Sequence, residues 1–523
     1  MGNMNLKLAE IIKTTSAEFF SPSVDTNFTV DNVLTDSRAS AKNSLFIALR
    51  GERFDAHDFI EDAINNGSQI IMVEDKAKAL QWGKVATVLL VNSTYVALQK
   101  VARLYRDNLR AKVITLTGSV GKTSTKDMLS QALASSAKVF KTAKNLNNNY
   151  GVAYTIFDIP TDADFAVLEC GMDGKGQLSE ISSTSNPDLV IITNIGTSHI
   201  EKLGSRKAIE EAKSEILDDA KPAAPLLILA EDPYLLNLAL AQKDKRAVAL
   251  LDTSGLSQKL RSNLAEDKSL PEVSESYIEE VSETLSKFKG ENIFPNLQSG
   301  VRYKISELEI NSQGMSFNFY KKLPDEKFIC LAKLRLNAWG SQLCENIIFA
   351  LALSDILGLN LKVIADSFAD KLDITPGRQE ITELSIGNLL VNDSYNASPE
   401  SMKSAFILSD HLKDKFDYQH SVAIIGGINE LGEYRESLHK DVARSLAMSD
   451  FDEILLIGPE AESMRTCIAD LSESKLIYTF NSNTEIIEYI SNKEYNNSIF
   501  LVKASRGFAL EEVAESIATQ YRK

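Results

Sequence analysis

Cysteine and basic residues are both scarce in this sequence. The 523 residues include four cysteines, which are scattered and form no Cys-x-x-Cys pair. This pattern argues against a disulfide framework and against a cysteine-rich zinc site, and it is typical of a reducing compartment. Lysine and arginine number 56 against 72 acidic residues, a formal net charge of −16. Because nucleic-acid binding needs clustered cations, we expect no nucleic-acid partner.

Long hydrophobic runs are also missing. No stretch reaches the roughly 18 consecutive apolar residues that a membrane span requires, and the opening MGNMNLKLAEIIKTT has no signal-peptide core. We therefore expect a cytoplasmic protein without a membrane span that acts on small molecules, and we expect a monomer. The length exceeds what one core supports, which predicts two to four domains.

The pattern of strands and helices divides the chain into three segments. Residues 1–110 mix short strands with helices, whereas residues 111–373 and 374–523 alternate β-branched apolar runs with helical stretches. That alternation favours parallel sheets. We expect an α/β protein with a small α/β domain, a central parallel-sheet domain and a C-terminal Rossmann-like α/β domain. The Ser-, Glu- and Lys-rich segment 252–300 is expected to be a partly helical surface insertion.

The stretch TLTGSVGKTSTKDML, residues 115–129, is the strongest chemical signal. A strand-like run enters a glycine-containing turn and a helix-like run leaves it, which is the setting of a phosphate-binding loop. Gly118 and Gly121 let backbone amides face a phosphate, Lys122 can reach its terminal oxygens, and the Thr123 hydroxyl can bind Mg²⁺. The usual first glycine is replaced by Leu116. We expect this loop to bind a nucleotide.

Two polar residues follow strands of the same predicted sheet. Glu169 ends the run AVLE, and His199 follows DLVIITNIG. The carboxyl ends of parallel strands form the ligand-binding edge of such sheets, and both side chains can bind Mg²⁺ or Mn²⁺. His199 is equally compatible with a loop histidine bonded to backbone. Lys213 lies in a predicted helix, where a solvated face is the default expectation.

Other candidates are weaker when each is taken alone. Arg378 could stabilise charge on a transferring phosphoryl group, and Asp393 could accept hydrogen bonds from a ribose, although both lie in sequences typical of turns and helix caps. Near the amino terminus, predicted loops contain Ser37, Arg38, Arg53 and His57, and two arginines beside Gly51 suit a diphosphate.

Nine sequence stretches occur in an order that resembles the Mur ligase family over nearly the whole chain outside 252–300. They are DSRAS…LFIALRGERFDAHDFIEDAINNG, TGSVGKTSTKDM, KNLNNNYGVAYTI, ECGM, TNIGTSHIEKLGS, EEAKSEIL, NDSYNASPESMKSA, NELGE and VKASRG. The nearest likeness is to the member that joins D-alanyl-D-alanine to UDP-N-acetylmuramoyl-tripeptide during peptidoglycan precursor synthesis. The resemblance implies an ATP-dependent ligase that works through an acyl phosphate and releases ADP and phosphate.

The resemblance also implies roles for individual residues. In the family, the lysine at position 213 is carbamylated by CO₂, and two Mg²⁺ ions are held by Thr123, Glu169, His199 and the Lys213 carbamate. The implied catalytic residues are Lys122, Glu169, His199, Lys213 and Arg378. The implied ATP-binding residues are Gly118, Ser119, Gly121, Lys122, Thr123, Ser124, Asn346, Arg378 and Asp393. The implied UDP-substrate residues are Ser37, Arg38, Gly51, Arg53, Phe54, Asn147 and Asn148.

Several departures from the family pattern leave alternatives open. Val120 stands where the loop usually has a small polar residue, and in LNAWGSQLCENI only Gly340 and Asn346 match the expected adenine-region motif. A related ligase that adds a diamino acid is one alternative, although its D-N-P-R motif is missing. A non-catalytic nucleotide-binding homologue is another. Amine-dependent release of ADP would distinguish a ligase from the latter.

Overall fold

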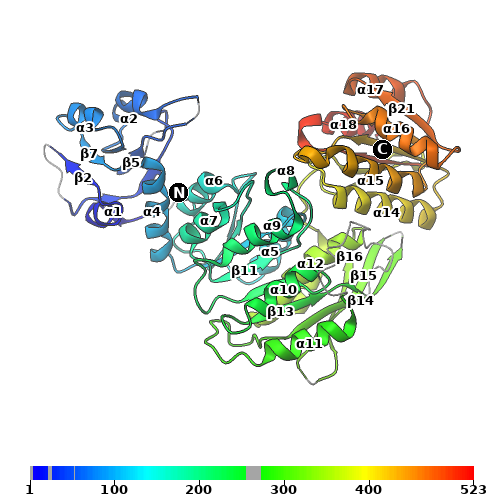
Figure 1. Cartoon of the computed structure of the whole chain (residues 1–523), viewed down its shortest axis with the longest axis horizontal. Coiled ribbons are helices and arrows are strands. Elements are labelled where there is room, and N and C mark those ends of the chain that lie inside the picture. The colour runs from blue at the N-terminus through cyan, green and yellow to red at the C-terminus, as the bar shows by residue number, and fades with distance from the viewer. Residues whose placement is uncertain are drawn as a thin grey trace.

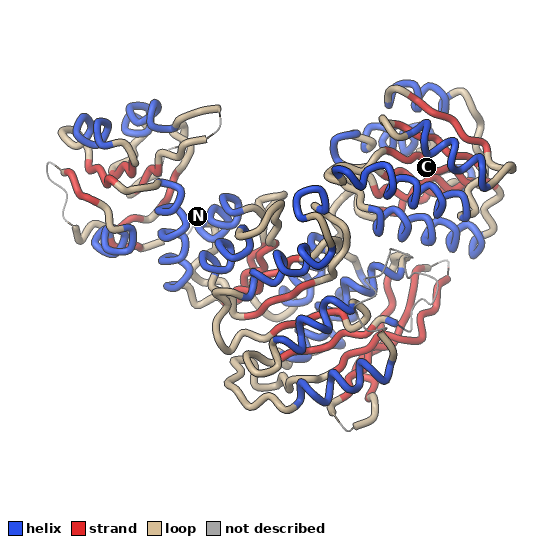
Figure 2. Tube along the Cα trace, in the orientation of Figure 1, coloured by secondary structure: helices blue, strands red, loops and turns tan. Residues whose placement is uncertain are grey.

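The structure is a computed structural model that describes residues 4–21, 26–39, 41–51, 53–254, 273–311, 313–324 and 326–522. Figure 1 shows three α/β lobes in chain order, with the amino-terminal lobe at one end and the C-terminal lobe at the other. In Figure 2 the strands run through the interior of each lobe and the helices lie outside them. The α/β fold class predicted from the sequence is confirmed.

The amino-terminal lobe contains a five-stranded sheet in the order β2-β7-β6-β5-β4, parallel except for β2, and the small pair β1-β3. The long helix α4 connects this lobe to the centre and packs on α6 and α7. The elements are β1 (Leu6–Lys7), α1 (Leu8–Thr15), β2 (Glu18–Phe20), β3 (Thr29–Val30), β4 (Asn32–Leu34), β5 (Ser44–Ile47), η1 (Ala56–Phe59), α2 (Ile60–Asn65), β6 (Ile70–Val73), α3 (Lys76–Trp82), β7 (Thr87–Leu90) and α4 (Thr94–Asn108).

The central lobe is built on a nine-stranded sheet in the order β16-β15-β14-β13-β12-β11-β8-β10-β9. Strands β8 to β14 pair in parallel, whereas β15 and β16 extend the sheet as an antiparallel meander. Its first elements are β8 (Lys112–Thr117), α5 (Lys122–Ala134), β9 (Val139–Lys141), α6 (Asn149–Phe157), β10 (Phe165–Glu169), α7 (Gln177–Ser185), β11 (Leu189–Ile192), α8 (Ile200–Leu203), α9 (Arg206–Ser214) and η2 (Glu215–Leu217).

The remaining central elements complete that sheet and cover its far side. They are β12 (Leu226–Leu229), α10 (Pro233–Ala241), β13 (Val248–Asp252), α11 (Glu275–Ser286), β14 (Arg302–Asn311), β15 (Gly314–Lys322), β16 (Ile329–Leu336), α12 (Ser341–Ile356) and α13 (Leu361–Asp370). The segment 252–300 overlaps residues 255–272, which lie outside the described residues. Its remainder includes α11, which buries Ile278, Val281 and Leu285 against α10, so this part contributes to the core.

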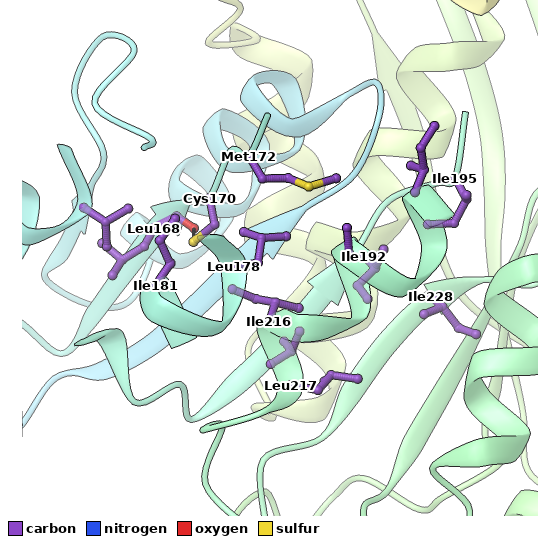
Figure 3. Close-up of a cluster of buried hydrophobic side chains, with 14 of the residues drawn as sticks. Leu168, Cys170, Met172, Leu178, Ile181, Ile192, Ile195, Ile216, Leu217 and Ile228 are labelled. Carbon is purple, nitrogen blue, oxygen red and sulfur yellow. Dashed lines mark hydrogen bonds between the residues drawn. The ribbon is translucent and has the colours of Figure 1, made fainter. Parts of the chain in front are cut away.

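Buried apolar side chains fix the edge of the sheet that carries the predicted site. Figure 3 shows Leu168 and Cys170, on either side of Glu169, beside Leu178 and Ile181 of α7. All four are at most 1% exposed. Because such dense packing resists displacement, the backbone around Glu169 is held in place from behind.

The C-terminal lobe has a six-stranded sheet in the order β17-β18-β22-β19-β20-β21, parallel except for β17. Its elements are β17 (Glu380–Glu383), η4 (Ser385–Gly387), β18 (Leu389–Asp393), α14 (Pro399–Phe416), β19 (His420–Gly426), η5 (Gly432–Tyr434), α15 (Arg435–Met448), β20 (Glu453–Ile457), α16 (Ala461–Leu471), β21 (Leu476–Phe480), α17 (Asn483–Ser491), β22 (Ser498–Lys503), η6 (Arg506–Phe508) and α18 (Glu511–Gln520). None of the helices in the described part of the chain combines the length and apolar character that crossing a membrane requires.

Candidate active site

The site forms where the order of the central strands reverses. Strand β8 lies between β10 and β11. The chain forms β9 and β10 on one side of β8 and then crosses to form β11 on the other side. Crevices at such switch points, beyond the carboxyl ends of the strands, are the usual ligand sites of open parallel sheets. The phosphate loop follows β8, Glu169 ends β10, and His199 follows β11.

Two glycines of the phosphate loop are required by its geometry. Gly118 has φ +149° and Gly121 has φ +83°, backbone angles that residues with a side chain rarely adopt. A Cβ atom on Gly118 would lie 1.9 Å from the Thr193 hydroxyl oxygen, and one on Gly121 would lie 2.4 Å from Oδ1 of Asn346. The loop therefore packs directly against the segment after β11 and against α12.

Asn194, two residues after the end of β11, holds the loop from behind. Its Oδ1 accepts hydrogen bonds from the backbone amides of Ser119 at 3.1 Å and Val120 at 2.9 Å. The neighbouring Thr193 donates its hydroxyl to the Val120 carbonyl at 2.7 Å. These contacts fix the loop conformation that directs the amino-terminal end of α5 toward the crevice.

Two lysines meet at one carbonyl oxygen of the loop. Lys122 and Lys213 donate to the Gly118 carbonyl, with Nζ–O distances of 2.7 and 3.1 Å. Lys213 is 1% exposed, so the solvated-face expectation for it is wrong. Burial, reinforced by the charge of Lys122, lowers the pKa of Lys213 well below its ordinary value. Burial also lowers the pKa of Lys122. The Lys213 amine is thus biased toward its neutral, nucleophilic form.

The Glu169 carboxylate is contacted by three donor side chains, two from α5 and one from the loop before α6. Its Oε1 accepts from the Thr123 hydroxyl at 3.3 Å and from Nδ2 of Asn147 at 3.0 Å. Its Oε2 lies 3.3 Å from Nζ of Lys126, and the Lys126 and Glu169 side chains are each 4% exposed. The carboxylate is therefore held in one orientation beside the hydroxyl of the phosphate loop.

His199 contacts the C-terminal lobe. Its Nδ1 lies 2.7 Å from Oε2 of Glu430, which comes from the loop after β19. His199 lines the crevice together with Glu169 and Lys122, while Lys213 lies behind the loop.

The C-terminal lobe supplies the opposite wall of the crevice. Nη2 of Arg378 reaches the Thr123 hydroxyl at 3.4 Å, and its guanidinium carbon lies 4.3 Å from the centre of the Tyr395 ring. Asp393 pairs with the buried Lys503 at 2.6 Å. On the central lobe, Asn346 accepts a hydrogen bond from the Thr125 hydroxyl at 3.1 Å, close to the phosphate loop.

The crevice between these walls has a volume of about 1500 Å³. That exceeds the ~300–1000 Å³ of an ordinary small-ligand pocket and leaves room for more than one substrate. It gathers twelve of the residues named from the sequence, which are Ser119, Gly121, Lys122, Thr123, Ser124, Asn147, Asn148, Glu169, His199, Asn346, Arg378 and Asp393. Of these, Asn148 also caps α6, because its Oδ1 accepts the Gly151 amide at 2.8 Å.

Five candidates for UDP binding lie outside this crevice, on the amino-terminal lobe: Ser37, Arg38, Gly51, Arg53 and Phe54. Arg38 is 88% exposed and pairs with Asp36 through two of its nitrogens. Phe54 is 74% exposed. The structure therefore leaves the Arg38, Arg53 and Phe54 side chains on an open surface and brings none of the five residues into the crevice beside the phosphate loop.

The crevice-lining residues that sequence reasoning missed include Lys126, Tyr395, Glu430 and Lys503. Lys126 could have been found, because it follows Lys122 by one helical turn and so shares its face. Lys503 could also have been found, since it ends the strand that neighbours Asp393. The contact of Glu430 with His199 joins residues on different lobes and leaves no signal in the local sequence.

The donor set fits a magnesium ion that is bound mainly by a nucleotide. Within the described residues, no group of three His, Cys, Asp or Glu side chains could hold a metal by itself. Thr123 and Glu169 do place a hydroxyl beside a carboxylate, 3.3 Å apart. Mg²⁺ typically takes one or two protein oxygens and completes its shell with phosphates and water. These residues therefore suit such an ion.

The fold and the crevice together define a three-lobed α/β protein with a phosphate-binding loop at its centre. Comparison with protein-family models matches residues 29–115 to the Mur ligase family catalytic domain, residues 116–273 to the Mur ligase middle domain, and residues 377–506 to the Mur ligase glutamate ligase domain. The chain belongs to the Mur ligase family, and the protein is a ligase.

Similar proteins match along nearly the whole chain. A UDP-N-acetylmuramoyl-tripeptide–D-alanyl-D-alanine ligase of Bacillus subtilis is 28% identical over 510 residues, covering 98% of this chain and 97% of that protein. The enzyme with the same name from Escherichia coli is 27% identical, with 94% of each covered. A crystal structure of MurF from Acinetobacter baumannii has a TM-score of 0.76 at 25% identity and covers both chains completely.

Proposed function

We propose that the protein joins D-alanyl-D-alanine to UDP-N-acetylmuramoyl-tripeptide with ATP, through an acyl phosphate, in the synthesis of peptidoglycan precursors. The observation that carries this proposal is the crevice in which Lys122, Glu169 and Arg378 face one another from two lobes. The relatives that match the full length carry the name of this reaction.

The cationic side chains of the crevice suit transfer of the ATP γ-phosphoryl group to a peptide carboxylate. Such transfers need positioning and neutralisation of charge more than covalent chemistry from the protein. Lys122 lies at the start of α5, and Arg378 reaches the hydroxyl of the next residue, Thr123, from the opposite wall. Together they place positive charge on both sides of the phosphates. Asn346 and Asp393 would contact the nucleoside.

Thr123 and Glu169 would hold one Mg²⁺, and His199 with a carbamate on Lys213 would hold a second. These ions, when bound, supply charge neutralisation on the phosphates. Lys126 and Asn147 keep the Glu169 carboxylate oriented toward Thr123. The neutral Lys213 amine would attack CO₂, forming an N–C bond and releasing one proton, which leaves a carbamate.

The later steps need no protein nucleophile. The dipeptide amine attacks the acyl phosphate carbon, a tetrahedral intermediate forms, and phosphate leaves. Because water would compete with the amine, the walls of the crevice must exclude it during this step. The contacts that Arg378 and Glu430 make across the crevice bring the two lobes together for that purpose.

The amino-terminal lobe would bind the UDP portion of the substrate. Arg38 and Arg53 supply cations for the diphosphate, beside Ser37, Gly51 and the exposed ring of Phe54. Asn147 and Asn148 lie in the crevice, where the peptide end would arrive. We propose limits of 1–110, 111–373 and 374–523 for the substrate, ATP and C-terminal domains. We further propose a cytoplasmic monomer.

The experiment that tests this function is ADP release from ATP and Mg²⁺ with UDP-N-acetylmuramoyl-tripeptide, measured with and without D-alanyl-D-alanine. Release that requires both substrates supports the proposal, and peptides with lysine or diaminopimelate at the third position then identify the preferred acceptor. Release that requires a free diamino acid instead would indicate another reaction of the family. Nucleotide binding without any release would indicate a non-catalytic homologue.

A further inference from the structure

The loop that carries His199 is held by the C-terminal lobe at four points. Besides the His199–Glu430 contact at 2.7 Å, Glu400 at the start of α14 accepts hydrogen bonds from the amide and hydroxyl of Thr197, at 2.8 and 2.9 Å. The Tyr434 hydroxyl donates to the Gly204 carbonyl at 2.8 Å. All of these contacts cross from the lobe built on β18–β22 to the segment 197–204, which follows β11 and includes α8.

The fourth point is a close approach at Gly432 that leaves little room for a side chain. Gly432 has φ +50°, and a Cβ atom there would lie 2.6 Å from Cγ and 3.1 Å from Cα of Glu201. Helix α8, which starts directly after His199, therefore packs against η5, which starts two residues after Glu430. The histidine–carboxylate contact is thus flanked by the packing of α8 on η5 and by the hydrogen bonds of Thr197 to Glu400 at the start of α14.

Both partners of that contact have unusual backbone conformations. His199 has φ +64° and Glu430 has φ +63°. A left-handed conformation is unfavourable for a residue with a side chain, and such conformations persist where surrounding structure imposes them. The same strained geometry at the two ends of one hydrogen bond indicates that both loops are shaped to bring these side chains together.

We propose that Glu430 is a positioning residue that the C-terminal lobe brings to His199 so that the imidazole can bind a metal ion. The inference rests on the proposed function, in which His199 is a metal ligand. Because Nδ1 faces the carboxylate, that nitrogen carries the proton and donates it, so the lone pair is on Nε2.

This arrangement makes the metal site dependent on the position of the C-terminal lobe. When Glu430 is against His199, the ring has one tautomer and one orientation. When the lobe moves away, the ring loses that partner and the affinity of the site falls. Since binding couplings are reciprocal, a metal ion on His199 favours the docked lobe by the same factor. Metal binding and closure over the reactive acyl phosphate are thus linked through one hydrogen bond.

The test measures Mn²⁺ binding to the full-length protein by electron paramagnetic resonance, with a non-hydrolysable ATP analogue and without peptide substrates. Removal of a carboxylate behind a metal-binding histidine typically weakens metal affinity 10- to 100-fold. We expect Glu430→Ala to weaken Mn²⁺ binding about 10-fold or more. Glu430→Gln should lose less, because its amide oxygen still accepts the Nδ1 proton. Glu433→Ala, an exposed glutamate on η5, is the matched control and should bind Mn²⁺ as the unaltered protein does.

The decisive variant is His199→Ala combined with Glu430→Ala. In the His199→Ala background, we expect Glu430→Ala to change Mn²⁺ affinity less than about 2-fold, because the ring that it positions is gone. An equal loss in both backgrounds, or no loss from Glu430→Ala alone, would overturn the proposal. Since the assay contains no peptide or dipeptide, this result is independent of the acceptor. The coupling can hold even if the ADP-release experiment assigns a different reaction.

Discussion

Replacing Glu169 by glutamine should destabilise the central lobe by an amount that the structure defines. The Lys126 and Glu169 side chains are each 4% exposed, with Nζ and Oε2 3.3 Å apart. The other carboxylate near Lys126 belongs to Asp127, at 3.9 Å, and it already binds Lys141 and Thr375. In Glu169→Gln the buried Lys126 therefore keeps its charge, and the carboxylate of Asp127 near it is already bound to other side chains.

Breaking a buried ion pair by removing one partner costs about 3–5 kcal/mol. We expect the lower end, about 3 kcal/mol, because the glutamine oxygen still accepts a hydrogen bond from Lys126. For a lobe of this size, that corresponds to a fall of roughly 6–12 °C in melting temperature. The assay is thermal unfolding at pH 7 without nucleotide. Adding Lys126→Met to Glu169→Gln should recover part of the loss, since the uncompensated charge is removed.

Asp162→Asn is the matched control for this prediction. Asp162 pairs with Lys138, but the two side chains are 61% and 67% exposed. Exposed pairs contribute about 0–1 kcal/mol, so the melting temperature of this variant should stay within about 2–4 °C of the unaltered protein. A Glu169→Gln protein that melts no lower than this control would refute the assignment of a buried, stabilising pair.

Three further changes test other parts of the structure. Lys122→Ala should lower kcat about 10³-fold or more, because a preorganised charge contact is lost, and near-normal turnover would contradict the phosphate-loop assignment. Lys213→Ala should be inactive and partly restored by formate or acetate, whereas a fully active variant would remove the carbamate from the mechanism. Glu453→Gln should lower stability at pH 7 by roughly 3 kcal/mol, measured by urea unfolding from pH 7 to 2. Burial would raise the pKa of Glu453, but hydrogen bonds from His420, Lys493, Tyr489 and Tyr495 lower it from 4.5 to about 2. The difference in free energy of unfolding between Glu453→Gln and the unaltered protein should therefore have its full value above pH 4.5 and shrink as the pH falls toward 2.

The sequence predicts those parts of the site that local pattern encodes. The phosphate loop is bounded by a strand and a helix of adjacent residues, so Gly118, Lys122 and Thr123 are readable from their immediate neighbours. Glu169 and Asp393 end strands of the central and the C-terminal sheet, respectively, and the carboxyl ends of the parallel strands in each sheet form a ligand-binding edge.

The rest of the site depends on contacts between distant segments. Lys213 lies in a helix at a position that the sequence alone assigns to the surface. It is buried because its side chain approaches the Gly118 carbonyl, 95 positions away in the sequence. Asn194 supports the phosphate loop from 74 and 75 positions away, through two backbone amides that no side-chain pattern reveals. Glu430 reaches His199 from another lobe. Each of these contacts follows from how complete lobes pack, which composition and periodicity do not specify.

The most direct test of the proposed chemistry follows oxygen atoms. UDP-N-acetylmuramoyl-tripeptide labelled with ¹⁸O in its terminal carboxylate is incubated with ATP, Mg²⁺ and D-alanyl-D-alanine, and the released phosphate is analysed by mass spectrometry. If ATP activates the carboxylate in the crevice, one ¹⁸O atom moves into phosphate for each amide bond formed. Phosphate free of label, released together with the amide product, would contradict an acyl phosphate and the roles assigned to Lys122 and Arg378.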